Sequence, residues 1–414
     1  MAKTDVVIVG GGLAGLCCAL RLEEKGLSCQ ILEAADRPGG RIRTDKVTGY
    51  QLDRGFQVLL TAYPEAQQKL AYSALELGNF YPGALIRFQG KFHTLSDPLR
   101  KWDTAIASLF SPVATLGDKL KLNSLRRSVC SGSLEDLYQR PETSTLERLE
   151  SLGFSKTVMD RFFRPFLGGI FLENDLATSS RKLDFVYRMF SLGAAALPAG
   201  GMQAIPDQLA GRLHAGTLRT NSRVAAIEDG RVRLAKGEVV ECDRVVLATD
   251  EPGATDLLGM ARPEQVCKVT CFYYAARKTP VQGPWLVLNG EGTGPINNLC
   301  VPSEVRPEYA PEGQALVSVT VLGIRDDAAG QLESEVRAQL SDWYGEKVEK
   351  WRLIKTYRIA YALPFQPPPT LTPVEKPAWL QERLYVCGDH ADTGSIQGSM
   401  ASGRRCADAI LGSA

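Results

Sequence analysis

The chain has 414 residues, of which 44% are hydrophobic and 23% charged, and its 48 basic and 47 acidic side chains leave a formal charge of +1. This length suits two or three domains of a soluble globular protein. The balanced charge argues against a nucleic-acid partner, because a phosphate backbone is usually met by a basic excess.

The ten cysteines are scattered through apolar runs such as LCCAL and LYVCG. They form no CxxC pair and no Cys/His cluster, so the sequence predicts neither a metal site nor a redox dithiol. The first residues lead directly into an apolar strand rather than a signal peptide, and no apolar run is long enough to span a bilayer. We therefore expect a cytoplasmic protein, with contact at a membrane surface still allowed.

A strand–helix–strand unit opens the chain. Residues 5–9, DVVIV, are typical of a parallel strand buried on both faces. Apolar side chains recur at helical spacing over 14–25, and Gly26 is a natural stop. CQILE, which ends at Glu33, predicts the second strand.

The middle of the chain has a different pattern. Residues 64–199 are expected to be mainly helical, and strands are expected again at 222–249, 268–276, 285–288 and 315–323. A strand over 384–388 and one last helix follow. The order predicts the α/β class, with a Rossmann-type domain assembled from segments 1–62, 200–262 and 376–414. An inserted α+β substrate domain would then comprise 63–199 and 263–375.

The first loop satisfies G-x-G-x-x-G between a strand and a helix, with Gly10, Gly12 and Gly15. Such a loop brings backbone N–H groups and the helix dipole to a pyrophosphate. Glu33 ends the second strand eighteen residues later, where an acid can bind a ribose diol, which favours a dinucleotide without a 2′-phosphate. We expect the neighbouring Leu13, Ala14 and Ala34 to contact the same nucleotide.

The residues that follow resemble the flavin amine oxidase and phytoene desaturase superfamily, which includes protoporphyrinogen oxidases. Its E-x-x-x-R-x-G-G-R-x-x-T signature is matched by Glu33, Arg37, Gly39, Gly40, Arg41 and Thr44. The family's next element, G-x-x-x-D-x-G, is matched by Gly49, Asp53 and Gly55. The resemblance implies that FAD is bound non-covalently and that Phe56 and Gln57 lie against the flavin ring.

The C-terminal segment resembles the closing motif of the same superfamily. The resemblance implies that Gly388 and Asp389 hold the ribityl and pyrophosphate part of FAD. It also implies that Gly398, Ser399 and Met400 open a helix directed at the flavin pyrimidine, where the positive helix end stabilises a reduced, anionic flavin. SRVAAIED resembles the strand that clasps the adenine, which implicates Val224.

The sequence also limits where electrons come from. Disulfide reductases need a cysteine pair soon after the acidic strand, but no cysteine lies between Cys29 and Cys130. A second G-x-G-x-x-G for NAD(P)H is missing as well. We therefore expect an organic electron donor, with oxygen or a quinone as the final acceptor.

The sequence departs from the amine oxidase pattern at two places, and both differences favour the carotenoid desaturases of the superfamily. G-D replaces G-E at 388–389, and YALPFQPPP stands where amine oxidases have a P-x-G segment. Segment 161–180 resembles the substrate domain of phytoene desaturase-like and protoporphyrinogen oxidase-like proteins. Five apolar side chains of this segment could line a substrate pocket: Phe162, Phe163, Phe166, Ile170 and Phe171. For any one of them, however, a place in the core of a helical domain is the favoured interpretation.

The leading hypothesis is an FAD-dependent dehydrogenase or desaturase acting on a large apolar substrate, such as a carotenoid-like isoprenoid or a porphyrinogen. The alternatives are an amine oxidase that releases hydrogen peroxide, and an FAD-bound partner protein without turnover. Residues 99–113 form an amphipathic helix candidate that either packs on the core or lies on a membrane. No histidine has an evident partner, so no catalytic residue is assigned.

Overall fold

The opening βαβ unit has the predicted form in a computed structural model that describes residues 4–96, 100, 111–228, 230–325 and 330–412. β1 (Thr4–Val9) pairs in parallel with β2 (Cys29–Leu32), and α1 (Leu13–Glu23) connects them. Residues 6–9 of β1 are buried, which accounts for the unbroken apolar run.

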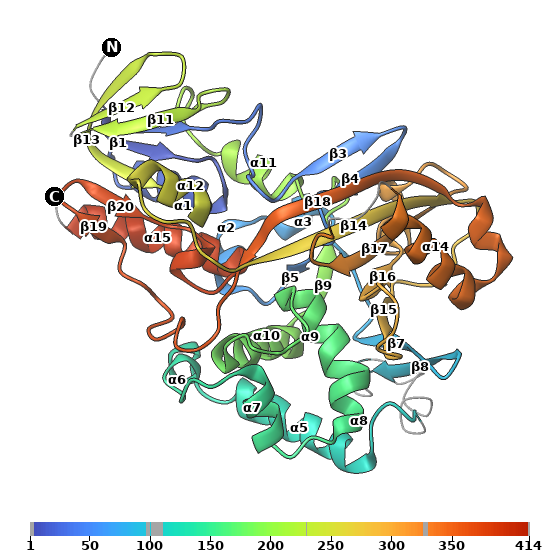
Figure 1. Ribbon diagram of the computed structural model, residues 1–414. Coiled ribbons are helices and arrows are strands. Elements are labelled where there is room, and N and C mark those ends of the chain that lie inside the picture. The colour runs from blue at the N-terminus through green and yellow to red at the C-terminus, as the bar shows by residue number, and fades with distance from the viewer. Residues whose placement is uncertain (1–3, 97–99, 101–110, 229, 326–329, 413–414) are drawn as a thin grey trace.

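Distant parts of the chain complete this sheet (Figure 1). β10 (Leu218–Arg219) lies beside β2, while β13 (Val239–Leu247) pairs in parallel with both β1 and β20 (Leu384–Val386). The remaining strands pair antiparallel at its margin: β11 (Val224–Glu228), β12 (Arg231–Leu234) and β19 (Trp379–Gln381). Three separated segments of the chain therefore share one eight-stranded sheet.

The last helix, α15 (Ile396–Gly412), packs directly on α1. The crossing is close because Gly403 has no side chain, and a Cβ there would overlap the backbone carbonyl of Ala14. Both helices belong to the same buried apolar cluster. The first and last helices are thus joined beside the glycine-rich turn that precedes α1.

A second, seven-stranded sheet lies beside the first, with the order β18-β14-β17-β16-β15-β7-β8. Its strands are β7 (Gly83–Phe88), β8 (Lys91–Ser96), β14 (Val266–Ala276), β15 (Leu286–Asn289), β16 (Asn298–Cys300), β17 (Ala315–Leu322) and β18 (Arg352–Pro364). The helix α14 (Gln331–Tyr344) covers one face, where Leu332, Val336 and Leu340 are buried.

The hairpin β7–β8 was not predicted within residues 64–199, which are otherwise mainly helical as expected. Its turn, Gln89–Gly90, has positive φ at both positions, 50° and 70°. Two such residues suit the tight hairpin turns that match strand twist. The predicted strands at 268–276, 285–288 and 315–323 are confirmed by β14, β15 and β17, each within a few residues.

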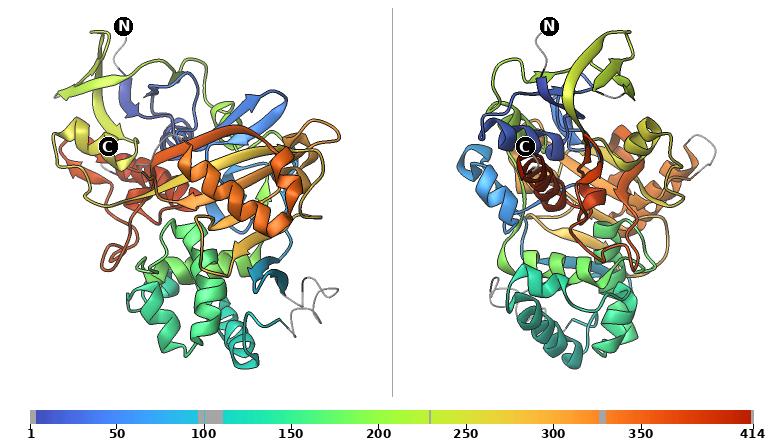
Figure 2. Two further views of the ribbon diagram at one scale, coloured as in Figure 1. Left: turned by 45° about the vertical axis from the view of Figure 1, so that its right-hand side comes forward. Right: turned by 90° about the vertical axis from the view of Figure 1, so that its left-hand side faces the viewer.

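Helices form a separate lobe below both sheets in Figures 1 and 2. They are α5 (Leu116–Cys130), α6 (Leu134–Tyr138), α7 (Thr145–Ser151), α8 (Lys156–Val158), α9 (Arg164–Phe171) and α10 (Ser180–Leu192), with a π-helical turn over Met159–Phe163. Capping boxes at Thr115, Ser133 and Ser144 start α5, α6 and α7.

Shorter elements join these layers. Two small sheets contain β3 (Thr44–Val47) with β4 (Tyr50–Asp53), and β5 (Leu59–Leu60), β9 (Ala195–Leu197) and β6 (Gly78–Asn79). The short helices are α2 (Pro64–Lys69), α3 (Tyr72–Leu75), α11 (Ala204–Ala210), α12 (Glu251–Leu258) and α13 (Pro302–Val305). The mixed α/β class is confirmed. The amphipathic candidate at 99–113 lies almost wholly outside the described residues, and no described helix is long and apolar enough to cross a bilayer.

Candidate functional site

A single cavity of about 2010 Å³ runs from the first nucleotide-type turn to the helical lobe. Pockets for small ligands usually measure about 300–1,000 Å³, so this space can hold a dinucleotide and a second molecule. Most of the residues predicted from the sequence line it: Gly10, Gly12, Leu13, Ala14, Glu33, Ala34, Gly39, Gly40, Arg41, Gly55, Phe56, Gln57, Val224, Gly388, Asp389 and Ser399.

Four predicted residues do not line the cavity. A Cβ at Gly15 would overlap the carbonyl of Gly10, and one at Gly398 would overlap that of Thr393. Met400 is fully buried in the core. Arg37 points its guanidinium toward Asp36, at 3.4 Å, on the surface. The two glycines permit close packing behind the loops that line the cavity.

The turn before α1 has room for an anion. Gly12 is the residue preceding the helix, and a Cβ built on it meets no atom within 4 Å. Gly10 has a φ of 110°, and a Cβ there would lie 2.7 Å from the carbonyl oxygen of Ala248. No side chain caps the helix, so its first N–H groups face the cavity beside Gly12. This cradle suits a phosphate.

Glu33 stands where the predicted ribose contact requires an acid. Its side chain is buried, and its two oxygens accept hydrogen bonds from the backbone N–H of Gly11, at 2.6 Å, and of Ala35, at 2.7 Å. These bonds fix the carboxylate at the end of β2, on the wall of the cavity. A carboxylate has further lone pairs and can still accept hydroxyl groups.

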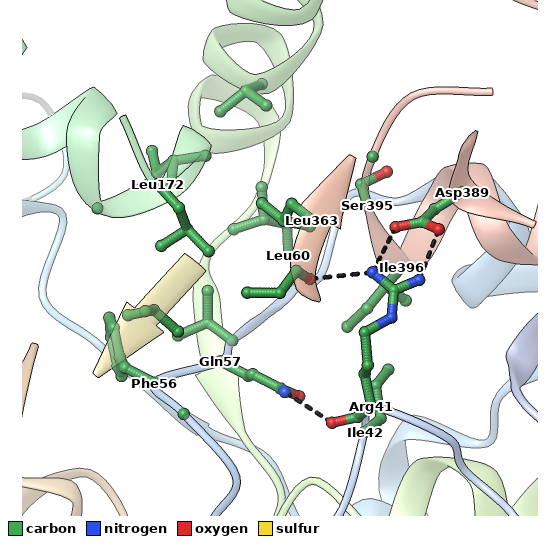
Figure 3. A pocket seen from close by; sticks show the side chains of 18 of the residues that line it. Arg41, Ile42, Phe56, Gln57, Leu60, Leu172, Leu363, Asp389, Ser395 and Ile396 are labelled. Carbon is green, nitrogen blue, oxygen red and sulfur yellow. Dashed lines mark hydrogen bonds and ion pairs between the residues drawn. The ribbon is translucent and has the colours of Figure 1, made fainter. Parts of the chain in front are cut away.

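Arg41 and Asp389 form a two-pronged ion pair across the cavity (Figure 3), with N–O distances of 2.8 and 2.5 Å. Arg41 also donates to the carbonyl of Ala362, at 2.9 Å, and lies over the ring of Tyr361. Burial alone would raise the pKa of Asp389, but the guanidinium outweighs it and lowers that pKa. The pair joins the loop after β2 to the loop after β20.

Gln57 offers an unpaired acceptor at the same end of the cavity. Its amide nitrogen donates to the carbonyl of Arg41, at 2.9 Å, whereas its buried Oε1 has no hydrogen-bond partner. Buried acceptors of this kind usually have a partner. The open glycine turn, the fixed acid and this acceptor together fit a large polar cofactor such as a flavin dinucleotide.

The far part of the cavity is apolar. Phe162, Phe166 and Ile170 line it, and the first two rings stack at 5.1 Å between centroids. Phe163 and Phe171 point away from the cavity and belong to the core of the helical lobe. The five side chains singled out in segment 161–171 therefore divide between wall and core, as helical spacing requires.

Several residues of the cavity wall were missed by the sequence reasoning. Leu363, Ser395 and Ile396 flank the ion pair in Figure 3, and Lys182 lines the same region. Lys182 carried a usable signal, because it precedes Val186 and Met189 by helical spacings on the buried side of α10. A lysine at such an apolar position is unusual.

Residues 13–411 match the family described as flavin containing amine oxidoreductase. The chain belongs to this family. The match spans nearly the whole sequence, so the predicted superfamily is confirmed and the protein is a flavin-containing oxidoreductase.

Similar proteins fall in several branches of this family. The chain is 25% identical to hydroxysqualene dehydroxylase from Rhodopseudomonas palustris over 99% of both chains. It is 26% identical to phytoene dehydrogenase from Streptomyces griseus over 61% of this chain and 56% of that protein. Coproporphyrinogen III oxidase from Mycobacterium tuberculosis is 24% identical over 61% of this chain and 57% of the relative.

Solved structures share the fold. A redesigned putrescine oxidase has a TM-score of 0.74 with 17% identity, covering 100% of this chain and 99% of its own. A protoporphyrinogen oxidase-like protein from Exiguobacterium has a TM-score of 0.73 with 18% identity over both whole chains. These likenesses confirm the architecture.

Proposed function

We propose that the protein binds FAD non-covalently in this cavity and uses it for hydride transfer with a large, apolar, isoprenoid-type substrate. The observation that carries the proposal is the continuity of one cavity from the open turn at Gly12 to the phenylalanine-lined chamber. When bound, FAD supplies the two-electron chemistry, and the chain supplies binding, orientation and exclusion of water.

The residues of the cavity suggest how the cofactor is held. The N-terminus of α1 would bind the pyrophosphate, Glu33 a ribose, and the backbone at Val224 the adenine. Gly388, Asp389 and the start of α15 would hold the flavin end. No cysteine or histidine is among the described lining residues, which supports non-covalent attachment. The predicted residues that do not line the cavity would support the site without contacting the cofactor: Gly15, Arg37, Gly398 and Met400.

We also propose that segments 1–62, 200–262 and 376–414 form the FAD-binding domain, and that 63–199 and 263–375 form the substrate-binding domain. The strands of the two large sheets come from these two sets of segments. The cavity would then lie between the domains.

The wall beside the ion pair supports an apolar substrate over an amine. Leu363, Ser395 and Ile396 lie there, so this part of the cavity wall presents aliphatic and small side chains. The relatives named phytoene dehydrogenase and coproporphyrinogen III oxidase point to hydride removal from an apolar or porphyrinogen substrate. Oxygen or a quinone would then accept the electrons.

Hydride transfer in the opposite direction, from the flavin to the substrate, is favoured by the full-length match to a hydroxysqualene dehydroxylase. Dehydroxylation replaces a hydroxyl by hydrogen, so the flavin would deliver a hydride rather than remove one. The hydroxyl would take up a proton and leave as water, and a separate organic two-electron donor would reduce the flavin again. Both directions use the same cavity and the same class of substrate.

The test follows the visible flavin absorbance of the purified holoprotein without oxygen. We expect bleaching of the oxidised flavin by isoprenoid polyenes or by a lipid and pigment extract, and none by a panel of amines. Reoxidation of a dithionite-reduced flavin by isoprenoid alcohols would favour hydride transfer in the opposite direction. Bleaching by amines alone would overturn the proposal in favour of an amine oxidase.

We further propose that α5 brings the mouth of the cavity to a membrane surface. Leu116 and Leu120 are 66% and 73% exposed, and both line the cavity. Exposed leucines beside an opening give an apolar substrate a route from the bilayer. Sedimentation with phosphatidylglycerol vesicles should decrease in an L116Q/L120Q protein and persist in M260Q, which changes an exposed residue that does not line the cavity. Equal sedimentation of both would contradict the proposal.

A further inference from the structure

Lys182 is a buried cation on the cavity wall that no described residue binds. Only 2% of the residue is exposed, yet it lines the cavity, and its ammonium makes no hydrogen bond or ion pair with any residue that the structure describes. The centroid of the Phe171 ring lies 5.4 Å from the ammonium nitrogen. Taking an ammonium out of water without a partner is costly, so such a group calls for an explanation.

The polar groups around Lys182 make their hydrogen bonds to other residues, and Glu173 keeps one buried oxygen, Oε2, without a partner among the described residues. Gln366 Oε1 accepts the N–H of Gly394, at 2.8 Å, and Asp389 is held by Arg41. Glu173 accepts the N–H of Thr178, at 3.1 Å, through one oxygen, and no ion pair joins it to Lys182. The ammonium therefore has unused donors at the cavity surface.

The position of Lys182 on α10 shows what reaches it. Lys182, Val186 and Phe190 all line the cavity and follow one another at four-residue spacing, so they form one stripe along the helix. The stripe is about 12 Å long from a rise of about 1.5 Å per residue. A long apolar molecule lying along it would have apolar neighbours at Val186 and Phe190 and a donor at Lys182.

Lys182 lies at the end of the stripe nearest the expected flavin. A Cβ built on Gly394 would be 3.0 Å from its Nζ, and Gly394 directly precedes Ser395 and Ile396 beside the Arg41–Asp389 pair. Its charged neighbours are Asp389, Glu173 and Arg41, with Cys267 also close. The two acids balance the two bases, which favours a neutral ligand atom over a carboxylate.

We propose that Lys182 donates a hydrogen bond to a hydroxyl oxygen on an otherwise apolar isoprenoid ligand, and so selects alcohols over hydrocarbons. This inference rests on the proposed function, because it needs an apolar substrate in the chamber. Lys182 is then a positioning residue that fixes which carbon of the chain faces the flavin. Burial lowers the pKa of its ammonium, because an ammonium removed from water loses its hydration.

The test compares a C15 isoprenoid alcohol with the hydrocarbon of the same carbon skeleton, each titrated from detergent micelles into holoprotein. Binding is followed by the shift of the oxidised flavin spectrum, so turnover is not required. A hydrogen bond from a charged donor is strong, and we expect the alcohol to bind at least about tenfold more tightly than the hydrocarbon.

In K182M this preference should fall to about twofold, while the hydrocarbon binds as well as before. K182R should retain part of the preference, because it keeps a charged donor. The matched control is K350M, which removes an exposed lysine that does not line the cavity, and it should behave as wild type. K182M should also have an equal or higher thermal midpoint, because an unpaired buried charge is gone.

The outcomes separate the two proposals. If neither ligand shifts the wild-type spectrum, the apolar-substrate proposal fails and the role of Lys182 fails with it. If both ligands bind and K182M keeps the wild-type preference, the Lys182 inference alone is overturned. A K182M protein that loses its flavin or its cooperative unfolding also overturns it, since Lys182 would then be a cofactor or structural group.

Discussion

Replacing Gly12 by alanine should abolish flavin binding while leaving the fold intact. Gly12 has φ −72° and ψ 178°, which alanine adopts without strain, and the new methyl group meets no protein atom within 4 Å. An alanine preceding a helix is somewhat less favourable than glycine, so the apoprotein should lose less than about 1 kcal/mol. The methyl group would stand in the space that the pyrophosphate needs.

The expected loss of affinity follows from the contacts that a displaced phosphate gives up. Hydrogen bonds to a charged group contribute about 1.5–3 kcal/mol each, so losing two of them costs about 3–6 kcal/mol. This corresponds to a dissociation constant for FAD raised about 10²- to 10⁴-fold. This loss of FAD affinity is much larger than the loss of less than about 1 kcal/mol in apoprotein stability could cause.

The assay strips the flavin with chaotrope and titrates FAD back, following the quenching of its fluorescence. G117A is the matched control, because Gly117 lies in α5 outside the cavity lining and a Cβ there has its nearest neighbour, Thr115 Oγ1, at 3.7 Å. An FAD affinity within threefold of wild type in G12A would refute the placement of the pyrophosphate. So would a G12A apoprotein that no longer unfolds cooperatively.

Three further substitutions probe the interior. D389A leaves Arg41 without its partner and should lower the free energy of unfolding by about 3–5 kcal/mol, with loss of flavin. Chemical denaturation measures this free energy, and a decrease of less than about 1 kcal/mol would contradict the prediction. Burial raises the pKa of Asp53 from 3.8 to about 6. The folded protein should therefore lose about 3 kcal/mol of stability in all as pH rises from 4 to 6. Thermal unfolding followed against pH should show this loss in the wild type and not in D53N. F163A should cost about 3–5 kcal/mol in urea, whereas F162A, on the cavity wall, should chiefly weaken ligand binding; equal stability losses would contradict the division between wall and core.

The glycine-rich turn before α1 and its sheet could be predicted from the sequence because their signals are local. Gly10, Gly12 and Glu33 follow from the requirements of a tight turn, a phosphate and a buried strand end. The resemblance of the last segment to the same superfamily then placed Asp389 at the cavity. The match to the flavin containing amine oxidoreductase family confirms that reading of the family.

Other features depend on contacts that no local pattern encodes. Arg41 and Asp389 are 348 positions apart, and only the fold brings them to hydrogen-bond distance. The hairpin β7–β8 was missed because its turn is Gln89–Gly90 rather than the commoner Asn-Gly or Asp-Gly. Lys182 was overlooked because a lysine within a helix ordinarily faces solvent.

Helical periodicity placed segment 161–171 in the right lobe without saying which side faces the cavity. The π-helical turn over Met159–Phe163 changes the phase of the side chains just before α9. Phe162 and Phe166, four residues apart, share the cavity wall, while Phe163 turns into the core. A sequence pattern with one fixed period does not reveal such a shift.

The central claim is that the bound flavin exchanges a hydride with an isoprenoid chain in this cavity. A single anaerobic turnover tests it most directly, with the flavin absorbance and the mass of the recovered isoprenoid measured in the same sample. We expect one flavin to be reduced for each pair of hydrogens that the isoprenoid loses, or one reduced flavin to be oxidised for each hydroxyl replaced by hydrogen. A flavin that changes redox state with amines while every isoprenoid is recovered unaltered would contradict the claim.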